Sequence, residues 1–188
     1  MELETERLVL RDFVTEDAAA LAACRHGDAF WRFYEPRADT HGEAREHVGM
    51  FVAWQGEKPR THFQLATVLK EDGRLIGSCG IRQRPQVQYG ESSPSEADIG
   101  YELDPEYWGQ GYATEAVGRL LTFGFGEMGL HRVWAFCLLE NTASWRVMEH
   151  LGMRREGVLR ANVRLREQWW DTAVYGMLAE EWRSRMSK

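Results

Sequence analysis

The sequence has little cysteine, little proline and no long apolar run. Its 188 residues include five prolines and three cysteines, Cys24, Cys79 and Cys137, which lie far apart without paired spacing. This pattern indicates reduced thiols and excludes a disulfide-stapled protein. No apolar run approaches the roughly 20 residues that span a bilayer. The first residues are acidic, where a secretion signal is basic and then apolar, so we expect a soluble, cytoplasmic protein.

The chain also lacks an excess of positive charge. Its 23 basic and 29 acidic residues give a formal net charge of −6, which argues against a general nucleic-acid binder. The six histidines form no HExxH or paired ligand pattern, so no metal site is expected. The absence of Gly-x-Ser-x-Gly weighs against a serine hydrolase. Tryptophan is abundant, with eight residues, for which core packing is the safer interpretation.

Hydrophobic periodicity predicts an α+β protein with a mixed, mostly antiparallel sheet. Hairpins in the first half and a strand–helix–strand crossover in the second half indicate this topology. We expect one domain over residues 1–188, with Thr15 and Thr40 as helix N-caps. The predicted seven strands are 8–13, 62–68, 75–81, 97–103, 132–138, 156–163 and 170–178, and the predicted four helices are 15–25, 40–54, 111–128 and 144–151. A loop is predicted for residues 84–96, which contain Pro85 and Pro94.

A glycine-containing segment, Tyr107 to Ala116, joins the fourth predicted strand to the third helix. Gly109 and Gly111 would let the backbone approach a ligand closely, and N–H groups at a helix start attract phosphate. The alternative is a tight turn in which the glycines only relieve steric conflict. The segment has neither the Gly-Lys-Ser/Thr of a P-loop nor the full dinucleotide fingerprint.

A second polar segment, Asn141-Thr142-Ala143-Ser144, follows a predicted strand and opens a helix. Asn and Ser in this place are most often N-caps. The alternative is that the Asn141 amide or the Ser144 hydroxyl reaches a ligand.

Together these segments resemble the GCN5-related N-acetyltransferases, the GNAT superfamily, and within it the RimJ/RimL-type branch. The resemblance extends from Thr5–Arg11 to Asp171–Gly176 and is most specific at 99–103, 107–116 and 141–153. It implies acetyl transfer from acetyl-CoA to an amine, in a sheet that is splayed between the fourth and fifth strands.

The resemblance also implies how acetyl-CoA would be held. Tyr101 and Leu103 would offer backbone hydrogen bonds to the pantetheine arm, Asn141 would contact it, and Ser144 would lie near the thioester sulfur. The pyrophosphate would bind the backbone amides of Gly109, Gln110, Gly111, Tyr112, Ala113 and Thr114.

Two positions depart from the family pattern. Trp108 stands where the loop often begins with Arg or Gln, although RimJ/RimL-like sequences often have this Trp. Met148 stands where many members have a Tyr that protonates the leaving thiolate. Ser144 is then the nearest proton donor, unless the thiolate leaves without help.

Attack by an amine on a thioester also requires a proton acceptor. We predict Glu102 as the general base, directly or through water, with Asp98 on the same strand face as the second choice. For each, the alternative is a solvated residue or an ion-pair partner. The resemblance assigns stabilisation of the oxyanion to a backbone N–H near Leu103.

Residues 91–106 contain six acids and no base, which favours a cationic acceptor. We expect a protein N-terminal amine of the ribosomal-protein type. The alternatives are a small-molecule amine (an aminoglycoside, polyamine or amino acid) and an acyl-CoA-binding module without catalysis. No direct nucleic-acid or membrane partner is expected, and a homodimer is left open because dimers are common in the family.

Overall fold

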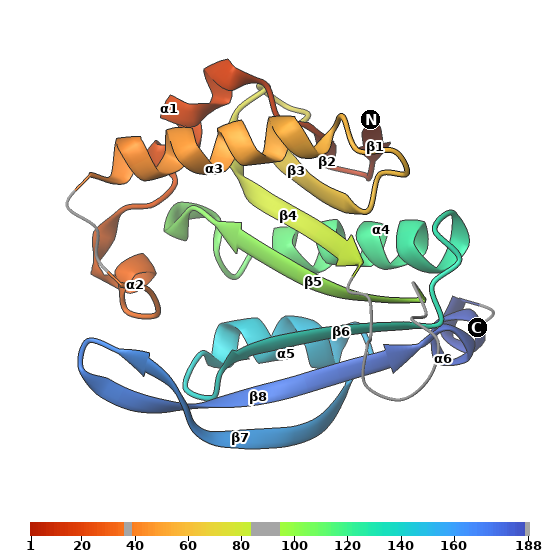
Figure 1. The fold of residues 1–188 in the computed structure, drawn as a ribbon. Coiled ribbons are helices and arrows are strands. Elements are labelled where there is room, and N and C mark those ends of the chain that lie inside the picture. Colours follow the sequence, from red (N-terminus) through yellow and green to blue (C-terminus); the bar gives the residue numbers. More distant parts are fainter. Residues whose placement is uncertain (36–38, 84–94, 187–188) are drawn as a thin grey trace. The chain divides into compact units, whose positions relative to one another are not determined.

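The computed structural model describes residues 1–35, 39–83 and 95–186 (Figure 1). The chain divides into two compact units, residues 1–80 with 100–119 and residues 81–99 with 120–188. It passes between them within β4 (Leu75–Gln83), β5 (Glu96–Leu103) and α4 (Tyr112–Gly126). The strand order is β1-β2-β3-β4-β5-β6-β8-β7. A single domain over the whole chain stays a prediction.

In the first unit, helices cover antiparallel strands. β1 (Glu2–Glu4) pairs with β2 (Leu8–Asp12), which pairs with β3 (His62–Leu69). Figure 1 shows α1 (Ala18–Ala23) and α3 (Thr40–Trp54) beside these strands. Apolar side chains from both helices meet the strands in one buried cluster that includes Phe13, Leu21, Val48, Phe51 and Val68.

The first unit also holds three short helical segments. α2 (Gly27–Trp31) follows α1. Two 3-10 turns, η1 (Thr15–Asp17) and η2 (Pro105–Tyr107), precede α1 and α4. The turn η2 forms the connection between β5 and the start of α4.

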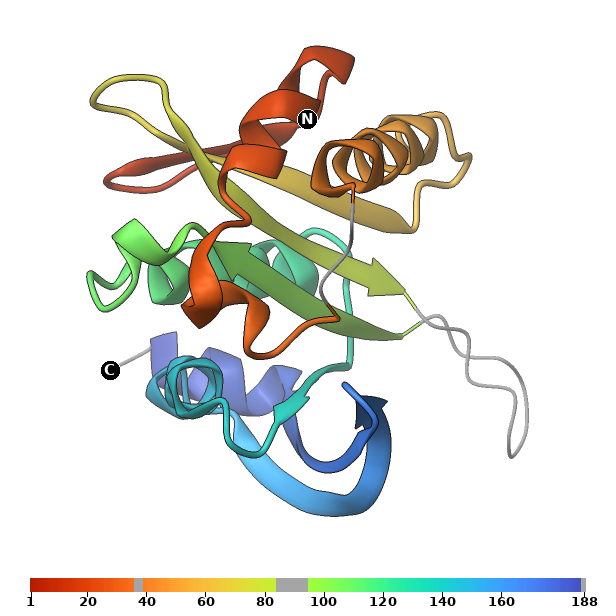
Figure 2. The ribbon, with the colours of Figure 1, turned by 90° about the vertical axis from the view of Figure 1, so that its left-hand side faces the viewer.

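The second unit is built on a three-stranded antiparallel arrangement. β6 (Arg132–Leu138) pairs with β8 (Gln168–Leu178), and β8 pairs with β7 (Arg154–Leu165). Figure 2 shows β7 and β8 in blue as a long curved hairpin. Two further helices complete the unit, α5 (Thr142–His150) and α6 (Ala179–Met186).

The ladder between β5 and β6 is parallel and short. It pairs Glu96–Asp98 with Arg132–Trp134, and the strands continue to Leu103 and Leu138. Parallel neighbours need a long crossover connection, and α4 lies between them in the sequence. The predicted strand–helix–strand crossover is therefore confirmed.

All seven predicted strands and all four predicted helices are present; the bounds of 132–138 and 40–54 are as predicted, and the ends of the others are shifted. The described residues hold eight strands and six α-helices, because β1, α2 and α6 were not predicted. The predicted N-caps are wrong: Asp39 caps α3 by accepting from Gly42 N at 2.7 Å, and Val14 precedes η1. An Asp one residue earlier takes the role given to Thr40. Most of the predicted loop, residues 84–94, lies outside the described residues.

Candidate active site

The segment before α4 has the backbone geometry of a helix-start anion site. Gly109 and Gly111 have φ of 73° and 84°, in the left-handed region that favours glycine. The first bond inside the helix runs from Glu115 N–H to the Gly111 carbonyl at 3.0 Å. The four preceding amides, from Gly111 to Thr114, therefore have no acceptor within the helix. These N–H groups and the positive end of the helix dipole suit a phosphate group.

Arg7 and Glu115 hold this helix start in place. Arg7 donates from Nη1 to the Gln110 carbonyl at 3.0 Å and from Nε to Glu115 Oε2 at 2.7 Å. Its guanidinium carbon lies 4.2 Å from the centre of the Tyr112 ring. Glu115 also accepts from Thr5 Oγ1 at 2.6 Å and Arg7 N at 2.7 Å. Burial raises the pKa of Glu115, but the hydrogen bonds from Thr5 and Arg7 outweigh it and lower the pKa.

The sequence did not indicate Arg7 as a site residue. Its contacts bridge more than a hundred positions of the chain, so no local spacing reveals them. The one signal is its place in the Thr5–Arg11 segment, which carries part of the family resemblance.

Trp108 links the loop to the end of β5. Its indole Nε1 donates to the Leu103 carbonyl at 2.8 Å. Asp104 N–H donates towards β4, to Ile76 O at 2.9 Å. Backbone groups alternate in direction along a strand, so those of Tyr101 and Leu103 face away from β4. This is the orientation that a backbone-bonded ligand requires.

Glu102 lies in an ion pair. Its Oε1 accepts from Arg25 Nη2 at 2.7 Å and from Ser78 Oγ at 3.2 Å. The side chains of Arg25 and Glu102 are 7% and 14% exposed. Burial lowers the pKa of Arg25, but the charge and hydrogen bond of Glu102 raise it above its ordinary value. The ion-pair alternative for Glu102 is therefore observed, and its role as a base is unchanged as a prediction.

Asp98 is more deeply buried than Glu102. Arg82 donates from Nε to Asp98 Oδ2 at 2.9 Å, and the Asp98 side chain is 5% exposed. A carboxylate that is buried and paired with a guanidinium fits a structural ion pair.

Other acids of the 91–106 segment are also paired. Arg132 donates to Glu96 at 3.2 Å, and His26 lies 3.1 Å from Asp104. Glu91 lies outside the described residues. Basic side chains from other elements therefore offset much of the charge that the sequence concentrates here.

In the second unit, the Asn141 segment opens α5. Asn141 Oδ1 accepts from Ser144 N at 3.1 Å, so the N-cap interpretation is confirmed. The cap uses the amide oxygen, and the amide nitrogen is the part of Asn141 that can donate to a ligand. Met148 is buried, with 1% of its surface exposed, and a thioether has no proton to donate.

Ser144 lies beside Cys137. Burial raises the pKa of the Cys137 thiol to about 11, although a hydrogen bond with Ser144 and the charge of Arg155 oppose this shift. Cys137 is therefore a thiol at neutral pH and a poor nucleophile. The Ser144 hydroxyl has a proton to donate, which its predicted role as proton donor to the leaving thiolate requires.

Across residues 1–35, 39–83 and 95–186, no group of three or more His, Cys, Asp or Glu side chains could hold a metal ion. In the same part of the chain, no helix is long and apolar enough to cross a membrane.

Similar proteins identify the family. The model of the acetyltransferase (GNAT) domain matches residues 7–154. The uncharacterised N-acetyltransferase YnaD of Bacillus subtilis is 32% identical over 97% of this chain and 99% of its own length. A candidate ribosomal N-acetyltransferase of the same species, YdaF, is 32% identical over 59% of this chain and 57% of its own.

Solved structures agree with the sequence comparisons. A GNAT-family acetyltransferase from Bacillus anthracis is 31% identical, with a TM-score of 0.78 over 96% of this chain and all of that one. RimJ of Mycobacterium smegmatis in complex with CoA-disulfide is 27% identical, with a TM-score of 0.76 over 96% of this chain and 87% of that one. The predicted resemblance is confirmed: the chain belongs to the GNAT family and is an N-acetyltransferase.

Proposed function

We propose that the chain transfers the acetyl group of acetyl-CoA to a protein N-terminal amine of the ribosomal-protein type. The assignment of acetyl-CoA as the donor rests on the start of α4. There, the backbone at Gly109 and Gly111 exposes a row of amides, and Arg7 and Glu115 hold this segment in place. The GNAT family uses acetyl-CoA, and the similar RimJ structure contains CoA-disulfide. The acceptor rests on the name of the relative YdaF, a candidate ribosomal N-acetyltransferase.

In this proposal backbone groups and the Asn141 side chain bind acetyl-CoA, and the side chains of Glu102 and Ser144 move protons. Tyr101 and Leu103 offer backbone hydrogen bonds to the pantetheine, and the Leu103 N–H stabilises the oxyanion. Asn141 contacts the pantetheine through its amide nitrogen. The amides of Gly109, Gln110, Gly111, Tyr112, Ala113 and Thr114 hold the pyrophosphate.

Bound acetyl-CoA supplies the thioester carbonyl that the acceptor amine attacks. Glu102 accepts the proton of the amine. Ser144 donates a proton to the leaving sulfur and regains one from solvent. Asp98 serves in the ion pair with Arg82, so we assign it no catalytic step.

Two other functions use the same donor site. A small-molecule amine would lose its proton to Glu102 in the same way as a protein N-terminus. A module that binds acyl-CoA without catalysis is favoured by one observation, the buried Met148 at the position of the family's general acid.

A thiol-release assay with a panel of amines separates these functions. Peptides with free N-termini should be acetylated faster than spermidine, an aminoglycoside or free amino acids. Faster turnover of a small amine would replace the peptide acceptor, and binding without any turnover would support the module. In the control variant Gly111→Asp, a carboxylate replaces the hydrogen beside the amides, so acetyl-CoA should no longer bind in calorimetry.

A further inference from the structure

The two oxygens of the Glu102 carboxylate have different surroundings. Both hydrogen bonds that Glu102 receives from the described residues, one from Arg25 and one from Ser78, end on Oε1. Within the same described residues, no donor reaches Oε2. The side chain keeps 14% of its surface exposed. One oxygen is therefore anchored, and the other is engaged by none of the described residues.

The guanidinium that anchors Oε1 is itself held on two sides. Arg25 Nη1 lies 3.1 Å from His47 Nδ1, and because an arginine only donates, this ring nitrogen must accept. The Arg25 Nε is buried and has no partner among the described residues. A buried ion pair contributes little net stability, and an unsatisfied buried donor is costly. Stability alone therefore gives a poor account of this arrangement.

We propose that Arg25 is a positioning residue that, with Ser78, fixes Glu102 so that Oε2 receives the proton of the acceptor amine. This inference rests on the proposed function. The amine nitrogen bonds to the thioester carbon and forms the oxyanion that the Leu103 N–H stabilises. When this intermediate collapses, the carbon–sulfur bond breaks and its electron pair leaves with the sulfur. The proton lost by the nitrogen moves to Oε2, while Oε1 keeps its two hydrogen bonds. The exposed edge of Glu102 then returns the proton to solvent.

Several other titratable groups face this cluster. Burial, then the charges of Asp104 and Glu102, raise the pKa of Cys24 to about 12. Desolvation of the phenol, then the Glu102 charge, raise the pKa of Tyr34, although the residue as a whole is exposed. Both groups stay neutral at pH 7. Tyr101 and Glu43 also face the cluster, and the Glu43 carboxylate lies 3.9 Å from His47 Nε2.

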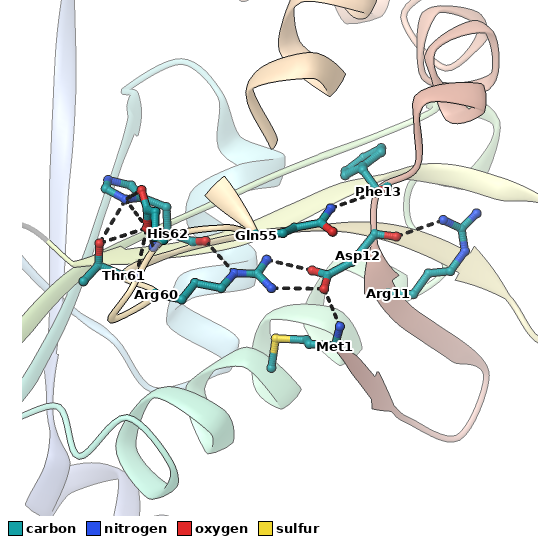
Figure 3. A network of polar contacts seen from close by, with 9 residues as sticks. Met1, Arg11, Asp12, Phe13, Gln55, Arg60, Thr61 and His62 are labelled. Carbon is teal, nitrogen blue, oxygen red and sulfur yellow. Dashed lines mark hydrogen bonds and ion pairs between the residues drawn. The ribbon is translucent and has the colours of Figure 1, made fainter. Parts of the chain in front are cut away.

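The test compares Arg25→Gln and Arg25→Lys with a matched control. Arg60→Gln removes another partly buried arginine–carboxylate pair of the same unit, Arg60 with Asp12, in which the side chains are 15% and 17% exposed (Figure 3). Turnover is measured by thiol release with the best amine of the panel, from pH 5 to 10. Acetyl-CoA affinity is measured by calorimetry.

Arg25→Gln should lower kcat about 10- to 100-fold and leave acetyl-CoA affinity within about twofold, because the donor site keeps its residues. The acid limb of the pH profile should move to higher pH, since a carboxylate that loses a nearby cation is protonated more readily. Arg25→Lys should restore part of the lost kcat and move the acid limb part of the way back to its wild-type position. Arg60→Gln should lower the melting temperature without moving the limb.

A double-mutant cycle tests the assignment to Glu102. If Arg25 acts through Glu102, Arg25→Gln should have no further effect on kcat in a Glu102→Gln background. Ser78→Ala, a smaller change, gives a second test if Arg25→Gln unfolds, and should lower kcat a few-fold with unchanged acetyl-CoA affinity.

Additive effects in the cycle, or an unmoved acid limb in a folded Arg25→Gln, would overturn the inference and leave the acetyltransferase function intact. If Arg25→Gln unfolds, unchanged kcat in Ser78→Ala overturns it. A wild-type chain without turnover on any amine would remove the proposed function first, and this assignment with it.

Discussion

Asn141 uses its two amide atoms for different purposes in our proposal. Its oxygen caps α5 through Ser144 N, and its nitrogen would donate to the pantetheine. Asn141→Ala removes both atoms and should cost about 1 kcal/mol of unfolding free energy, together with acetyl-CoA affinity. Asn141→Asp keeps the capping oxygen, so stability should hold while affinity falls. Urea unfolding and calorimetry measure the two effects separately. Wild-type affinity in Asn141→Asp would reduce Asn141 to a helix cap.

The Glu57 carboxylate makes the stability of the folded protein depend on pH. It accepts from Thr61 N at 3.0 Å and from His62 N at 3.1 Å and His62 Nδ1 at 2.9 Å (Figure 3 shows Thr61 and His62). Burial raises the pKa of Glu57, but these hydrogen bonds outweigh it and hold the pKa at about 2. The folded pKa lies below the ordinary value of 4.5. The stabilisation is therefore full above pH 4.5 and lost as the pH falls towards 2.

Glu57→Gln should accordingly unfold at lower urea concentration than wild type at pH 7. The difference should shrink between pH 4.5 and 2, where the wild-type carboxylate also becomes neutral. Glu71→Gln, in the exposed turn after β3, serves as the control and should match wild type throughout. A Glu57→Gln midpoint that stays equally displaced at pH 2 would show that the hydrogen bonds do not act through the charge.

At the scale of elements, α4 is fixed at its first turn by Arg7, from the segment between β1 and β2. Arg7→Met should weaken acetyl-CoA binding by about tenfold, because the loop loses the bond to Gln110 and a nearby cation. Lys70→Met is the matched control: it removes a more exposed ion pair, Lys70 with Glu4, from the same edge of the unit. Calorimetry should show wild-type affinity for the control, and equal affinity in both variants would argue against a role for Arg7.

Periodicity predicted elements whose side chains alternate between core and surface. In α4, Ala116, Val117, Leu120 and Leu121 recur at helical spacing in the sequence, and all four are buried. The missed elements are short or lack this signal: β1 has three residues and α2 has five. The helix α6 has two apolar residues that are buried, Ala179 and Trp182, among charged ones.

The candidate site also has parts that the sequence pattern predicted and parts that it missed. The Tyr107–Ala116 segment could be read from the sequence because its glycines and helix start are contiguous. Arg25 could not, since its partner Glu102 lies 77 positions away and an arginine after a short alanine-rich helix has no distinctive spacing. The sequence therefore predicted the backbone-built part of the site better than the side chains that orient it.

At the scale of the whole molecule, the acidic segment has a different meaning from the one its composition indicates. Glu96, Asp98, Glu102 and Asp104 each meet a basic partner, namely Arg132, Arg82, Arg25 and His26. Pairing weakens the field that these acids present to solvent. The acceptor proposal therefore rests on the name of the relative YdaF more than on the charge of this segment.

The three cysteines bear on the order of the chemical steps. All three are buried, and burial raises the thiol pKa to about 12 for Cys24 and Cys79 and about 11 for Cys137. Burial therefore keeps Cys137 in the thiol form near pH 8, whereas the thiolate is the form that attacks a thioester. An acetyl-enzyme on sulfur is therefore disfavoured, and direct attack by the amine predicts sequential kinetics. Double-reciprocal plots for acetyl-CoA and amine should intersect, and Cys137→Ala should keep turnover. Parallel lines, or acetyl found on Cys137 or Ser144 by mass spectrometry after incubation without acceptor, would contradict direct attack.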